Sequence, residues 1–143
     1  MNSNHARVTR VYTAPEGSTV ENDAPNVSDL GWHVPGFDLI VDAAAGAAIG
    51  DCGAPYTLTI TLVNLTKQAS VGTPFSFVKQ QKFDAATGWT SSRDDFVLTY
   101  RAHFPDAPPP PNAAHDLYRF YVSMVTPGLR VVSFAGSRLF ILV

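Results

Sequence analysis

Cysteine is nearly absent from this chain. Cys52 is the only one, so the sequence excludes an intrachain disulfide framework. A lack of disulfides is typical of a reducing compartment. The neighbours Asp51 and Gly53 supply no base to activate the thiol, so we expect Cys52 to be inert.

An excess of one sign of charge is also missing. Ten Lys and Arg residues stand against twelve Asp and Glu residues, which gives a formal net charge of -2. The basic residues are scattered singly, whereas proteins that bind nucleic acid or anionic membranes concentrate them in a patch. We therefore expect no nucleic-acid partner.

Long hydrophobic runs are missing as well. The first seven residues, MNSNHAR, lack the apolar core of a signal peptide. No apolar run approaches the roughly 20 residues that a membrane-spanning helix requires. The sequence predicts a cytoplasmic protein with no membrane span, and export of a processed form is the alternative.

The familiar catalytic motifs are absent from the sequence. It contains no Gly-X-Ser-X-Gly, no glycine-rich phosphate loop, no dinucleotide fingerprint and no His-Glu-X-X-His. His33, His103 and His115 lack the spacing of a metal-ligand pair, so we expect solvated surface histidines. These absences predict a protein that is not an enzyme and uses no cofactor or metal.

The strongest positive signal is an unbroken alternation of apolar and hydroxyl side chains over residues 56–62, YTLTITL. Successive side chains of a β-strand point to opposite faces of the sheet. Tyr56, Leu58, Ile60 and Leu62 therefore share one face, and three threonines share the other. This pattern predicts a strand that is buried on one side only.

Weaker versions of the alternation recur between turn signals. They predict further strands over residues 7–14, 37–45, 74–83, 96–104, 117–125, 129–135 and 138–143. Residues 15–35 are predicted to form a long loop, in which 31–34 is the likeliest place for an edge strand. The segment 117–125 is apolar on both faces, which favours a central strand.

The strand count and the length together predict the architecture. A chain of 143 residues with 45% hydrophobic residues suits one domain, over residues 1–143. We expect residues 1–6 to be a flexible N-terminus and residues 105–116 a stiff, proline-rich connection. About eight strands with regular turns predict an all-β, antiparallel β-sandwich of the immunoglobulin-like Greek-key type, with a jelly roll as the alternative.

Two tryptophans beside turns are the most interesting candidates for a ligand site. Loop tryptophans can stack on sugar rings or anchor a protein partner. Trp89 is followed by Arg93 and Asp94, whose polar groups could bind hydroxyls, and Trp32 could join them. The structural alternative is that each tryptophan covers one end of the core.

Three functions are consistent with these residues. The leading hypothesis is a non-enzymatic β-sandwich that acts through protein–protein contacts, either by self-association or as an adaptor. The alternative is a carbohydrate- or small-ligand-binding module that uses Trp89, Arg93, Asp94 and Trp32. The third is a jelly-roll hydrolase or metal enzyme with His103 or His115 beside an aspartate.

The C-terminal run 139–143 is expected to be a buried strand, with pairing to another subunit as its alternative.

Overall fold

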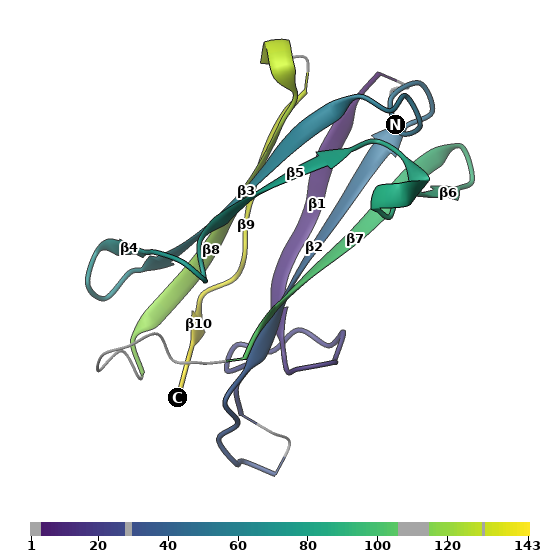
Figure 1. Ribbon diagram of the computed structural model, residues 1–143. Helices are drawn as coiled ribbons and strands as arrows, with labels where there is room; N and C mark the ends of the chain where they lie inside the picture. The colour runs from purple at the N-terminus through teal and green to yellow at the C-terminus, as the bar shows by residue number, and fades with distance from the viewer. Residues whose placement is uncertain (1–3, 28–29, 106–114, 130) are drawn as a thin grey trace.

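The chain folds into two antiparallel sheets that pack face to face (Figure 1). The computed structural model describes residues 4–27, 30–105, 115–129 and 131–143. Its only helical segments in those residues are the 3-10 turns η1 (Ala85–Thr87) and η2 (Pro127–Leu129). The predicted all-β sandwich is confirmed.

The first sheet has four strands in the order β1-β2-β7-β6, and every neighbouring pair is antiparallel. The second sheet follows the order β10-β8-β3-β4, while β9 also pairs with β8 and β5 with β3. The strand bounds are β1 (Ala6–Ala14), β2 (Phe37–Gly46), β3 (Pro55–Asn64), β4 (Ala69–Val71), β5 (Phe77–Lys82), β6 (Thr90–Ser92), β7 (Asp95–Phe104), β8 (Leu117–Val125), β9 (Val132–Gly136) and β10 (Phe140–Ile141).

The alternation in β3 sets the position of the core. The side chains of Tyr56, Leu58, Ile60 and Leu62 are at most 1% exposed, whereas the threonines between them are half-buried. Fully burying one such aliphatic side chain stabilises the fold by about 1.5–3 kcal/mol. The inward face of β3 therefore anchors the second sheet against the first.

Aromatic rings fill the centre of the sandwich. The ring of Phe37 on β2 lies 5.2 Å from that of Phe104 on β7 and 5.9 Å from that of Phe140 on β10. Phe120 on β8 stacks on Phe104 and on Phe140, at 5.8 and 5.5 Å between centroids. Strands far apart in the chain are thus joined by one aromatic cluster.

The segment 117–125 is a central strand, as predicted, but only one of its faces is covered. β8 lies between β3 on one side and β9 and β10 on the other. Its inward residues, Phe120 and Met124 among them, are buried, while outward Leu117 and Tyr121 are 37% and 42% exposed. Apolar residues on both faces therefore did not mean burial on both faces.

The long loop before β2 differs from the prediction. Residues 31–34 form no named strand, and the only pairing there is an isolated bridge between Val27 and His33. The residues that join the sheet edge lie earlier: Thr13 exchanges hydrogen bonds with Asn22 at 2.8 and 2.9 Å. Ile141 N–H then donates to the carbonyl of Asp23 at 2.8 Å.

The C-terminal run lies within the same chain's fold. Phe140 and Leu142 are 1% and 0% exposed, and β10 pairs with β8, so the expected burial holds for one face of the run, whereas Leu139 is 46% exposed. The proline-rich connection falls mainly on residues 106–114, outside the described residues, as do residues 1–3 of the predicted N-terminus. In the described part of the chain, no helix is long and apolar enough to cross a bilayer.

Candidate functional site

The residues predicted to form a ligand site are divided between the two ends of the first sheet. Trp89, Arg93 and Asp94 flank β6, beside the start of β7. Trp32 lies in the loop that leads into the start of β2, and the start of β2 lies beside the end of β7. The fold therefore does not bring Trp32 together with the other three (Figure 1).

Trp89 is part of the core, as its structural alternative predicted. Its side chain is 2% exposed, and its indole N–H donates to the hydroxyl of Tyr56 at 3.1 Å. That hydroxyl donates in turn to Gln81 Oε1 at 3.2 Å, and burial raises the pKa of Tyr56 to about 12. A buried, hydrogen-bonded indole offers no ring face to a ligand, so Trp89 is corrected from a stacking platform to a residue that closes one end of the core.

The other three predicted residues lie at the surface. Arg93 and Asp94 form the exposed turn between β6 and β7, with Arg93 at a φ of 56°. Trp32 is 70% exposed. Their roles in binding stay predictions.

The histidines considered as metal ligands lie on separate parts of the fold. His33 is in the loop before β2, His103 is on β7, and His115 comes just before β8. Among the described residues, no three His, Cys, Asp or Glu side chains are close enough to hold a metal ion together.

A compact ionic cluster, which we call the Asp38 cluster, lies on the outer face of the first sheet. The carboxylate of Asp38 is 3% exposed. It accepts a hydrogen bond from Gly17 N–H at 3.0 Å, pairs with the guanidinium of Arg101, and lies 2.7 Å from His103 Nδ1. The other ring nitrogen of His103 lies 3.5 Å from Glu16 Oε1. These residues join the loop after β1 to strands β2 and β7.

The electrostatics of the Asp38 cluster favour the ionised carboxylate. Burial by itself would raise the pKa of Asp38, but the hydrogen bonds from Gly17, His103 and Arg101 outweigh it and hold the pKa below its ordinary value. Within the described residues, no serine, threonine or cysteine side chain hydrogen-bonds to His103. The cluster therefore attaches the loop after β1 to strands β2 and β7. Among its described residues, it contains no nucleophile of the kind that a catalytic triad requires.

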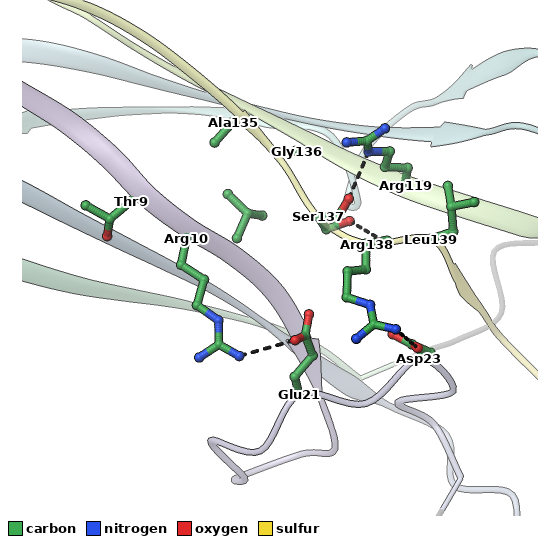
Figure 2. Close-up of a pocket in the computed structure, with 11 residues that line it drawn as sticks. Thr9, Arg10, Glu21, Asp23, Arg119, Ala135, Gly136, Ser137, Arg138 and Leu139 are labelled. Atoms are coloured by element: carbon green, nitrogen blue, oxygen red, sulfur yellow. Dashed lines mark hydrogen bonds and ion pairs between the residues drawn. The ribbon is translucent and has the colours of Figure 1, made fainter.

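A charged groove of about 790 Å³ runs between β1 and the segment that joins β9 to β10 (Figure 2). We call it the arginine groove. Arg10 pairs with Glu21 at 3.2 Å, and Arg138 pairs with Asp23 at 3.1 Å. Both carboxylates belong to the loop segment that is hydrogen-bonded to Thr13 and Ile141, so these ion pairs hold that segment in place.

The third arginine of the groove is bound to the backbone. Arg119 Nε donates to the carbonyl of Ser137 at 2.8 Å (Figure 2), and its guanidinium lies over the Tyr121 ring, 5.2 Å from the centroid. A Cβ at position 136 would lie 2.9 Å from Arg119 Nη2, so Gly136 leaves the space that this side chain occupies. The arginine groove is thus a set of internal contacts, and we do not assign a ligand to it.

The strongest candidate for a binding site is the outer face of the second sheet. Directly opposed residues of antiparallel strands share one face, so the register sets its composition. One row runs Phe134, Ser123, Thr59 and Val78 across β9, β8, β3 and β5. The rows on either side contain Val132, Val125, Thr57 and Gln80, and then Gly136, Tyr121 and Thr61. We call these three rows the aromatic face.

Large apolar side chains on the aromatic face are open to solvent. Phe134 is 74% exposed, Val78 58%, Val132 43% and Tyr121 42%. Isolated exposed apolar residues are normal, but a contiguous set on one face marks an interaction surface. Here Phe134, Val132 and Tyr121 lie on the neighbouring strands β9 and β8 in adjacent rows, whereas Ser123 and Thr59 separate Val78 from Phe134.

The aromatic face is hollowed at its centre. Phe134 and Tyr121 border a depression of about 430 Å³, and Thr59, Thr61 and Ser123 line it as well. We call it the aromatic groove. It is an open depression of the surface and not an enclosed cavity. An aromatic side chain of another molecule could therefore enter it.

The sequence contained a signal for the aromatic face. Phe134 and Val132 alternate with Ser133 in the predicted strand 129–135. Tyr121 alternates with Phe120 in the preceding predicted strand, 117–125. The sequence alone did not show that Phe134 and Tyr121 share a face, because that follows from the β8–β9 register.

No family model matches this chain, and a search of curated proteins gives no match.

Proposed function

We propose that the protein is a non-enzymatic binding module that acts through protein–protein contact, and that the aromatic face is its contact surface. The observation that carries the proposal is the 74% exposure of Phe134 beside Tyr121 and Val132 on one face of one sheet. Aromatic residues are enriched where proteins meet, and they supply most of the binding energy.

The composition of the aromatic face supports a protein partner more than a sugar. Its named residues offer hydroxyl, valine and aromatic side chains, and Gln80 is the only amide among them. The buried centre of a protein interface is poor in charge, as this face is. The carbohydrate alternative depended on stacking by loop tryptophans, and Trp89 is 2% exposed.

We also infer an immunoglobulin-like arrangement of the strands. In that fold one sheet contains strands A, B, E and D and the other contains C, F and G. Lettering β1, β2, β7 and β6 as A, B, E and D, and β3, β8 and β9 as C, F and G, gives the observed neighbours in both sheets. This order supports the immunoglobulin-like interpretation, and the aromatic face then lies on the sheet that contains C, F and G.

A photo-crosslinking experiment tests the contact surface. A benzophenone amino acid replaces Phe134 in one variant and Val97 in a matched control, in cells that make the protein. Val97 is an apolar residue on the outer face of the first sheet and is 39% exposed, so a probe there reports contacts of the opposite face. We expect discrete protein adducts from position 134 and none from position 97. Equal adducts from both positions, or none from position 134, would contradict the proposal.

A further inference from the structure

We propose that the partner of the aromatic face is a second copy of this chain, packed face to face about a two-fold axis. In this arrangement, Phe134 of each copy enters the aromatic groove of the other. The inference rests on the proposed function and adds the identity of the partner. Shape, charge and area each support it.

The relief of the aromatic face is self-complementary. Phe134 and Val132 project from β9, the smaller Ser123 lies on the adjacent strand β8, and Thr59 lies on β3, the strand beyond it. One face therefore contains both a ridge and a trough. A two-fold interface requires this combination, because each patch must contact a copy of itself: if residue i of one copy contacts residue j of the other, then j also contacts i.

The charge of the aromatic face suits pairing with itself. Its three rows contain no acidic or basic residue, and Arg119 lies beyond them at the Tyr121 end. In a two-fold interface the same patch of each copy meets the other, so a face with charges of one sign would repel its own copy. The whole chain has a formal net charge of only -2, so long-range repulsion between copies is also weak.

The area of the aromatic face fits a weak dimer. Two of its rows span four strands and the third spans three. Its eleven positions therefore cover about 360 Å² per copy, or about 720 Å² over two flat copies, from a strand spacing of about 4.8 Å and about 6.8 Å between same-face residues of a strand. Contacts smaller than the roughly 1,200 Å² at the lower end of stable, specific interfaces are weak or transient. We therefore expect a dimer that dissociates on dilution.

Sedimentation equilibrium on the purified full chain, over a wide concentration series, is the first test. We expect a reversible monomer–dimer equilibrium. Phe134→Glu should raise its dissociation constant about tenfold or more, since it introduces a charge at the contact and removes the aromatic ring. The matched control Val97→Glu should leave the constant unchanged. A strict monomer at every concentration, or a dimer that Phe134→Glu does not weaken, would overturn the inference.

A disulfide trap is the second test, and it checks the geometry. Two variants are mixed in a Cys52→Ser background, one with Phe134→Cys and the other with Thr59→Cys. Each such pair keeps one intact Phe134, on the chain that carries Thr59→Cys. We expect mild oxidation to link position 134 of one copy to position 59 of the other, as mapped by mass spectrometry. If no such link forms, the proposed geometry is wrong.

The two proposals fail in different ways. A strict monomer that crosslinks from position 134 to a different protein would overturn the second copy as partner and leave the proposed function intact. A protein that gives no adduct from position 134 and no dimer would overturn both. We expect each variant to keep its fold, since the substituted residues are on the surface, and circular dichroism of each variant checks this.

Discussion

Both sheets of the sandwich turn one face outward, and the two outer faces differ in what covers them. On the first sheet, Ile40 and Asp38 point outward and are 0% and 2% exposed. On the second sheet, Phe134 and Tyr121 point outward and are 74% and 42% exposed. The outward-facing Ile40 is thus buried, whereas the outward-facing Phe134 and Tyr121 are open to solvent.

On the first sheet, Asp38 is hydrogen-bonded to the loop after β1, and Ile40 packs with residues of β1 itself. Gly17 N–H donates to Asp38, and Asn22 N–H donates to the carbonyl of Thr13, so the loop is attached at both ends of the segment 17–22. Ile40, Tyr12 and Ala14 form a small apolar cluster on that outer face. Within the described residues, the aromatic face has no comparable attached loop.

The largest expected effect in this comparison is the loss of an apolar side chain from the covered face. Ile40→Ala removes a fully buried side chain and leaves a cavity, so we expect a loss of about 2–5 kcal/mol in the free energy of unfolding. Phe134→Ala on the open face should change it by at most about 0.5 kcal/mol. Urea unfolding of the monomer measures both. Equal losses would mean that the two outer faces do not differ in burial.

The next effect is the loss of the buried carboxylate. Asp38→Asn removes the charge that Arg101 and His103 contact, and we expect a loss of about 2–3 kcal/mol. The matched control is Asp42→Asn on the same strand, where a half-buried carboxylate accepts one hydrogen bond from Thr99 at 3.0 Å. It should cost about 1 kcal/mol or less. If the two variants were equally stable, the loop would not depend on the Asp38 cluster.

A smaller effect is expected in the pH dependence of stability. The pKa of Asp38 is lower in the folded protein than its ordinary value of 3.8, so its contribution is fully present well above pH 3.8. The contribution is lost as the pH falls through the lower, folded pKa. Unfolding free energies measured between pH 6 and about pH 2 should therefore fall less steeply for Asp38→Asn than for the wild type. Parallel curves would contradict this assignment.

Local pattern was sufficient for most of the strands and for the inward face of β3, but it missed the short strands β4 and β6. The alternation in residues 56–62 predicted the inward face of β3, and Tyr56, Leu58 and Ile60 are all at most 1% exposed. The pattern also predicted that 117–125 is a central strand, and β8 does have neighbours on both sides. Side-chain periodicity is a local property of a strand, so it can be read without knowledge of its neighbours.

The sites were harder to predict because they join residues distant in the chain. Asp38 and His103 are directly opposed on β2 and β7, yet each looked like an ordinary outward residue of its own strand. Trp89 stood beside a turn, and only its contacts with Tyr56 and Phe83 show that it faces the core. Contacts of this kind depend on strand order and register, which a single sequence does not specify.

By itself, the sequence determined the all-β class, most of the strands, the inward side chains of β3 and β8, and the lack of a disulfide framework. The reason is that burial on one face of a strand forces an alternation of residue types that is visible locally. Only the tertiary structure decided which outward side chains are covered. An outward apolar residue is buried at Ile40, which packs with Tyr12 and Ala14 of β1, and exposed at Phe134. Such contacts depend on strand pairing and register, which are long-range properties of the fold.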